Sequence, residues 1–186
     1  MEKRGEVQSG HMSRLGLDLY LEMLEEEVNK LKGKPPTEQM ETEINLGLAA
    51  HIPSSYIEDG KERLRFYKAL SSAQNAPARE EIALAMRDRY GHFPAEFENF
   101  MAVLDFKQFL AGLEVERADL DVTSLKLLWR KEQKSVAPEK ILDMAARNDA
   151  IRILPPDSLL INLDTSLPFP EALGKIRSLL EQELLS

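Results

Sequence analysis

The spacing of the apolar residues changes at Gly112, and this change constrains the fold more than any other feature of the 186-residue sequence. Before Gly112, apolar residues recur every three or four positions, as on the buried face of amphipathic helices. After Gly112 they alternate with charged residues, as in strands that bury one face. Helices grouped ahead of strands predict an α+β fold rather than a regular alternation of helix and strand.

A long amphipathic helix is predicted over residues 15–32. Its apolar positions follow one another at intervals of three and four residues, namely Leu17, Leu21, Leu24, Val28 and Leu31. The Gly-Lys-Pro-Pro sequence that begins at Gly33 ends this pattern. The polar, proline-containing residues 35–41 that follow are typical of an exposed linker. We therefore expect two parts, a connecting segment of residues 1–38 and a domain of residues 39–186.

The remaining helices and strands are predicted from the same two patterns, the three-to-four-residue repeat of helices and the alternation of strands. Helices are expected over residues 60–73, 78–88, from 94 onward, 138–148 and 170–185. Strands are expected over residues 42–50, 113–115, 125–129, 150–154 and 159–163, the second and third forming a hairpin through residues 119–121. The predicted architecture is a helical cluster packed on a small, mainly antiparallel sheet and preceded by the long connecting helix.

Composition narrows the possible functions. The 32 acidic residues outnumber the 24 basic ones, and a net charge of −8 argues against direct DNA binding. The sequence has no cysteine, which agrees with a reducing compartment and excludes a disulfide framework or a cysteine nucleophile. No apolar run is long enough for a membrane span. Two glycine-rich motifs of phosphate-binding loops, Gly-x-x-x-x-Gly-Lys-Ser/Thr and Gly-x-Gly-x-x-Gly, are absent from the sequence. We therefore expect this chain not to bind ATP itself.

No pattern indicates a catalytic or metal site. His11, His51 and His92 are about forty residues apart, without a second histidine or a paired carboxylate one helical turn away. The Gly-x-Ser-x-Gly motif of serine hydrolases is absent. The carboxylate pairs Glu80/Glu81 and Asp119/Asp121 are typical of exposed surface charge. We expect no catalytic residue, no cofactor and no metal.

The most basic stretch, residues 126–134, places Trp129 beside several cations, a combination found on surfaces that bind single-stranded nucleic acid. The alternation of this stretch, however, puts Trp129 on the same side as Leu125 and Leu127, which predicts that it faces a core.

Several phrases occur in a distinctive order: Gly5-Glu-Val-Gln-Ser-Gly-His11, Leu15-Gly-Leu-Asp-Leu-Tyr20, Ile52-Pro-Ser-Ser-Tyr-Ile57 with Arg63-Leu-Arg-Phe-Tyr67, and Asp88-Arg-Tyr-Gly-His-Phe-Pro94. Together they resemble the C-terminal end of the bacterial transcription-repair coupling factor family, Mfd. The resemblance is dense from residue 5 to about residue 110 and looser from there to Ser186. It implies a parent protein that translocates on double-stranded DNA, removes stalled RNA polymerase and recruits the repair protein UvrA. ATP and Mg²⁺ would be bound by the motor domains of that parent.

The resemblance also implies roles for particular residues. Gln8, Gly10 and His11 match the end of the family's translocation motif, whose glutamine helps to couple ATP hydrolysis to movement. From about residue 40 the chain resembles the family's regulatory domain, which packs on an N-terminal UvrB-like module of the same protein and covers its UvrA-binding surface. Asp88 is the first interface residue that this implies, with Glu80, Glu81 and Arg89 as further candidates. Ala85 stands where relatives often have glutamate.

Other readings stay open. The motif that begins at Asp88 is also explained by structure alone, because Gly91 can end a helix with positive φ, Pro94 can begin the next helix, Tyr90 can fill the corner and Arg89 can cap carbonyls. An alternative function is a motor-associated element in which Gln8 and residues 126–134 contact DNA directly. A third is an independent small-molecule enzyme, which would need a pocket with perturbed titratable groups. The expected function remains non-catalytic regulation in the bacterial cytoplasm, with UvrA and RNA polymerase as indirect partners.

Overall fold

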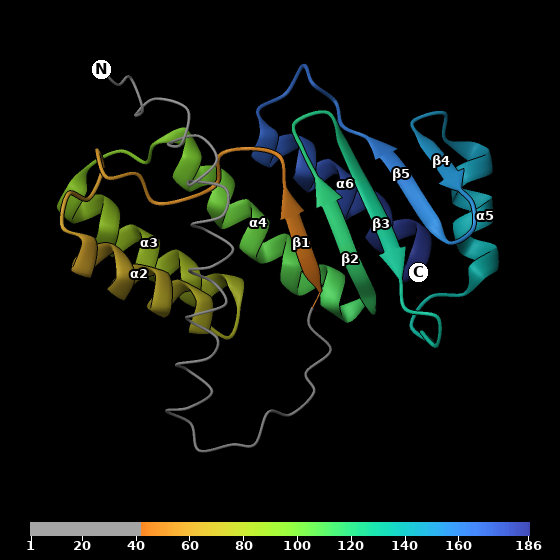
Figure 1. Ribbon diagram of the computed structural model, residues 1–186, viewed down its shortest axis with the longest axis horizontal. Coiled ribbons are helices and arrows are strands. Elements are labelled where there is room, and N and C mark those ends of the chain that lie inside the picture. Colours follow the sequence, from red (N-terminus) through yellow and green to blue (C-terminus); the bar gives the residue numbers. More distant parts are fainter. Residues whose placement is uncertain (1–41) are drawn as a thin grey trace, which may run out of the picture. The chain divides into compact units, whose positions relative to one another are not determined.

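The computed structural model describes residues 42–186, which form an α+β fold as predicted (Figure 1). The helices are α2 (Gly60–Ser72), α3 (Ala76–Tyr90), α4 (Ala95–Gly112), α5 (Pro138–Arg147) and α6 (Phe169–Leu184). The strands are β1 (Glu43–Leu46), β2 (Val115–Leu120), β3 (Ser124–Trp129), β4 (Ile151–Leu154) and β5 (Ser158–Asn162). The predicted helix over 15–32 and the residues Gln8, Gly10 and His11 lie outside the described part of the chain. Within residues 42–186, no helix is long and apolar enough to cross a membrane.

The described residues divide into two compact units. Unit A is formed by residues 51–97, and unit B by residues 42–50 and 98–186.

Unit A is built on the pair of helices α2 and α3. Asp59 begins α2 by accepting hydrogen bonds from the backbone N–H groups of Lys61 and Glu62, and Asn75 caps α3 in the same way. At the other end of α3, Gly91 adopts a φ of 89°, a conformation that glycine tolerates and other residues rarely adopt. The buried apolar side chains of the two helices are Phe66, Tyr67, Leu70, Ala83 and Met86.

The buried face of α3 differs from the one that we expected. The sequence pattern placed Ile82, Ala85, Met86 and Arg89 in register, but Ala85 and Arg89 are exposed and Ala83 and Arg79 are buried. Arg79 can be buried because its guanidinium donates to the carbonyl of Ala73 at 3.2 Å and its stem is aliphatic. A prediction based on the spacing of apolar residues misses a buried arginine, because arginine is counted as a polar residue.

Unit B contains a five-stranded sheet with the order β1-β2-β3-β5-β4. Only the β1–β2 pair is parallel, so the sheet is mainly antiparallel, as predicted. The turn of the β2–β3 hairpin lies at residues 121–123, slightly later than expected, because the Asp121 carboxylate accepts from the backbone N–H groups of Thr123 and Ser124. Helices α4 and α6 lie over one face of the sheet (Figure 1).

Strand β1 is shorter than the predicted 42–50 because of Gly47. The Gly47 N–H donates to the carbonyl of Leu120 at 2.8 Å, and a Cβ at this position would lie 2.9 Å from the Cβ of Asp121. Only glycine allows the chain to pass this close to the end of β2 as it leaves the sheet.

Candidate functional site

One face of α3 brings together the three acids that the sequence singled out. Glu80 and Asp88 are eight positions apart, with Leu84 midway between them, and residues four apart in a helix lie one above the other. Glu81 and Ala85 adjoin this row, and all five side chains are exposed. We call this set, Glu80, Glu81, Leu84, Ala85 and Asp88, the acidic face.

The acids of this face have no ionic partner in the described part of the chain. Among residues 42–186, no hydrogen bond or ion pair engages the side chain of Glu80, Glu81 or Asp88. Glu80, Glu81 and Asp88 give this helix face a negative charge, so the face is complementary to a basic protein surface. The arrangement fits binding of a protein surface rather than chemistry at a reacting atom.

Leu84 is a member of the acidic face that the sequence reading did not single out. Its side chain is 39% exposed and lies between the two acids of the row. Interfaces combine an apolar centre with a polar rim, and Leu84 is placed to serve as that centre. The signal was present in the sequence, because position 84 is four residues from both Glu80 and Asp88.

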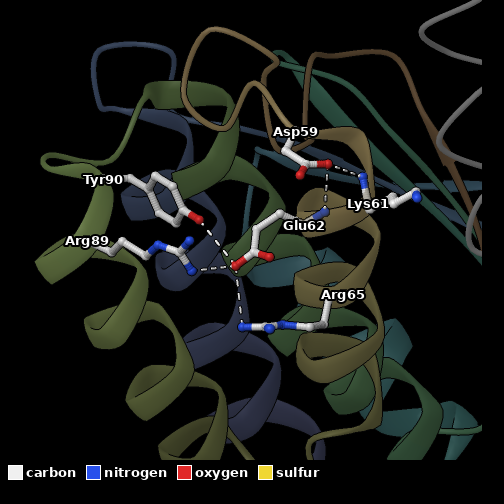
Figure 2. Close-up of polar contacts among 6 residues, drawn as sticks. All are labelled: Asp59, Lys61, Glu62, Arg65, Arg89 and Tyr90. Atoms are coloured by element: carbon white, nitrogen blue, oxygen red, sulfur yellow. Dashed lines mark hydrogen bonds and ion pairs between the residues drawn. The ribbon is translucent and has the colours of Figure 1, made fainter.

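Arg89 does not neutralise the acidic face, because it is bound to α2 (Figure 2). Its Nη1 donates to Oε1 of Glu62 at 2.6 Å. The same oxygen accepts a hydrogen bond from the Tyr90 hydroxyl at 3.3 Å and lies 3.3 Å from Nη2 of Arg65. Glu62 is therefore the centre of a polar cluster that connects the first turn of α2 with the last turn of α3. This contact replaces the expected capping of carbonyls by Arg89.

Tyr90 and Gly91 form the structural corner that the sequence suggested. The Tyr90 ring lies edge-on to the rings of Tyr56 and Phe66, at centroid distances of 5.8 and 6.0 Å. The Tyr56 hydroxyl donates to the carbonyl of Gly91 at 3.1 Å. Burial raises the pKa of Tyr90, so its hydroxyl keeps its proton and donates to Glu62 at neutral pH.

The basic stretch 126–134 does not present its aromatic ring. Trp129 is only 9% exposed and lies on the same side of β3 as the buried Leu125 and Leu127, as the alternation predicted. It is therefore not available to stack on a base. Within the described part of the chain, no group of three or more His, Cys, Asp or Glu side chains is placed to hold a metal ion.

Comparison with known proteins decides the family. The TRCF domain matches residues 46–141, which is just over half of the chain and includes the whole acidic face. The chain belongs to the TRCF domain family. This confirms the resemblance to transcription-repair coupling factors that the sequence motifs carried.

Relatives of the TRCF family are considerably longer than this chain. The chain is 36% identical to the transcription-repair-coupling factor of Bacillus subtilis (strain 168) over 129 residues, which are 69% of this chain and 11% of that protein. It is 30% identical to the Myxococcus xanthus protein of the same name over 157 residues, 84% of this chain and 13% of that protein. The chain thus spans only a small part of these relatives.

A solved structure supports the fold. The crystal structure of the C-terminal domain of transcription-repair coupling factor superimposes with a TM-score of 0.59 at 19% identity, covering 77% of this chain and 94% of that one. The fold of this chain is therefore that of a C-terminal domain of a coupling factor.

Proposed function

We propose that this chain is the non-catalytic regulatory domain of a transcription-coupled repair translocase. In this proposal the acidic face of α3 packs on the N-terminal UvrB-like module of the same protein, masks the surface that would bind UvrA and restrains the motor. The observation that carries the proposal is the set of exposed acids on one helix face of a TRCF domain, Glu80, Glu81 and Asp88, none of which forms an ion pair among residues 42–186.

A contact of this kind needs only a modest free energy. Interfaces between domains of one chain bury roughly 600–1,500 Å². A masking contact that lowers UvrA affinity tenfold to a hundredfold corresponds to a coupling free energy of ~1.4–2.7 kcal/mol. Three acids and one apolar side chain facing a basic surface are sufficient for that magnitude. In this proposal Arg89 joins α3 to α2 through its ion pair with Glu62. Asp88, which forms no ion pair among residues 42–186, contacts the UvrB-like module.

The remaining partners follow from the same proposal. UvrA and RNA polymerase would be affected indirectly, in the bacterial cytoplasm, and the motor domains of the parent protein would bind ATP and Mg²⁺. Direct DNA contact is the less favoured function, because an acidic face repels phosphate and Trp129 faces a core.

The test is a calorimetric titration of this chain with the UvrB-like module, for wild type and Asp88→Arg. The matched control is Glu132→Arg, which reverses an exposed charge in the loop after β3. We expect saturable binding that Asp88→Arg weakens at least tenfold and Glu132→Arg leaves within about twofold. Equal affinities for Asp88→Arg and wild type would reject the proposed interface. In the parent protein, Asp88→Arg should correspondingly increase UvrA binding and ATPase activity.

A further inference from the structure

The two faces of the sheet in unit B are covered differently. Leu125, Leu127, Leu159 and Ile161 point to one side, where each is at most 1% exposed. Helices α4 and α6 lie behind the strands on that side in Figure 1, and no helix of unit B lies over the opposite side. We call the opposite side the open face.

The open face carries leucines where a solvated sheet would carry polar residues. Strand pairing places Leu160 of β5 directly between Lys126 of β3 and Arg152 of β4. Leu128 and Leu154 lie on either side of Ser158 in the next row, and all three leucines are only half-buried. Consecutive apolar residues in a strand, such as Leu159-Leu160-Ile161, are typical of sheets covered on both sides. The composition of β3, β4 and β5 therefore indicates that a further element covers this face.

On the open face of β2 to β5 three basic residues, Arg117, Lys126 and Arg152, outnumber one acid, Asp119, which lies opposite Lys126, although the whole chain has a net charge of −8. Arg117 is compensated, because its Nε lies 3.4 Å from the Asp119 carboxylate. Lys126 and Arg152, which flank Leu160, form no ion pair among residues 42–186. An apolar centre between two unpaired cations fits a partner that offers apolar and acidic side chains together.

We propose that the open face binds an acidic amphipathic helix of a protein partner. The apolar stripe of that helix would cover Leu128, Leu154 and Leu160, and its glutamate or aspartate side chains would pair with Lys126 and Arg152. Docking of an amphipathic helix through apolar anchors at helical spacing is a common mode of recognition. This surface belongs to unit B, so it is separate from the acidic face of α3 in unit A and does not depend on the function proposed for that face.

Single-stranded nucleic acid fits the open face less well. Sheets that bind single strands supply aromatic rings on which bases stack. The open-face positions of β2 to β5 are Arg117, Asp119, Ser124, Lys126, Leu128, Arg152, Leu154, Ser158, Leu160 and Asn162, without an aromatic residue. The one indole of the hairpin, Trp129, is on the covered side. The cations of this face are therefore better suited to carboxylates than to stacked nucleotides.

The test uses two synthetic helical peptides of about 18 residues with the same leucine stripe at helical spacing. One peptide carries glutamates beside the stripe and the other carries lysines. Fluorescence anisotropy with the full chain should show saturable binding of the glutamate peptide at ~10–100 µM and at least tenfold weaker binding of the lysine peptide. Lys126→Glu combined with Arg152→Glu should weaken the glutamate peptide at least tenfold, whereas the exposed loop variant Lys131→Glu should not. Circular dichroism would establish that each variant is folded.

Three results would overturn the proposal. Equal binding of the two peptides would mean that the leucines bind any apolar helix and that Lys126 and Arg152 do not discriminate between acidic and basic peptides. No saturable binding of the glutamate peptide up to about 1 mM would mean that the face is not a helix site. Sedimentation showing that the chain self-associates, with loss of association in the Lys126→Glu, Arg152→Glu variant, would assign the face to a second copy.

Discussion

Nη1 of Arg89 lies 2.6 Å from Oε1 of Glu62, so the last turn of α3 is bound to the first turn of α2. The arginine side chain is 60% exposed and the glutamate 18%. A pair this exposed contributes little to stability, because solvent screens it. The pair matters because it directs the Arg89 guanidinium to Glu62 of α2, so that this cation is engaged there and not by Asp88.

Glu62→Gln should therefore weaken binding of a basic partner although Glu62 is not on the acidic face. The released Arg89 charge would oppose the partner, and we expect a loss of about threefold in the calorimetric affinity for the UvrB-like module. Adding Arg89→Met to Glu62→Gln should restore the affinity, because the opposing charge is gone. A double variant that binds more weakly than Glu62→Gln would show instead that Glu62 acts through the packing of α2 on α3.

Leu84→Ala should separate binding from folding. Leu84 is 39% exposed, so its truncation should leave the melting temperature nearly unchanged. If Leu84 is the apolar centre of the interface, the same change should cost ~1–2 kcal/mol of binding free energy in the titration with the module. The matched control is Leu142→Ala on α5, where the leucine is 55% exposed. An equal loss of affinity in both variants would remove the special role of Leu84.

The α+β class, the order of the elements and the inward direction of Trp129 were predictable, because each depends on the spacing of neighbouring apolar residues. The buried face of α3 was not, since Arg79 is buried through a hydrogen bond to the carbonyl of Ala73 that no periodicity records. The end of β1 depends on the approach of Gly47 to Asp121, and the Glu62 cluster joins residues 27 positions apart. Such contacts belong to the tertiary structure, so local patterns do not contain them.

Two glycine substitutions should change stability in opposite directions. Gly91 has a φ of 89° and a ψ of −158°, a backbone region nearly restricted to glycine, and an added Cβ would meet no atom within 4 Å, so the cost of Gly91→Ala is conformational, ~1–3 kcal/mol. Gly174 lies inside α6, where an added Cβ also has open space. Gly174→Ala should therefore stabilise the fold by ~0.5–1 kcal/mol through helix propensity. Urea unfolding of both variants measures this, and destabilisation by Gly174→Ala would contradict the helical reading of that site.

Acid should weaken the turn between β2 and β3. Hydrogen bonds from Thr123 and Ser124 hold the pKa of Asp121 below its ordinary value of 3.8. A carboxylate with a lowered folded-state pKa contributes stability that is complete well above its ordinary value and is lost as the pH falls below that value. Asp121→Asn should thus lower the free energy of unfolding at pH 7, and this difference from wild type should shrink at pH 3.

Urea unfolding of wild type and Asp121→Asn at the two pH values isolates this carboxylate from the rest of the chain. Glu114 provides a second acid-sensitive contact, because hydrogen bonds from the backbone N–H groups of Lys134 and Ser135 lower its pKa. Wild type and Asp121→Asn share Glu114, so its titration cancels in the comparison. A difference between the two proteins that is the same at pH 7 and pH 3 would mean that the turn is stabilised by the shape of the Asp121 side chain and not by its charge.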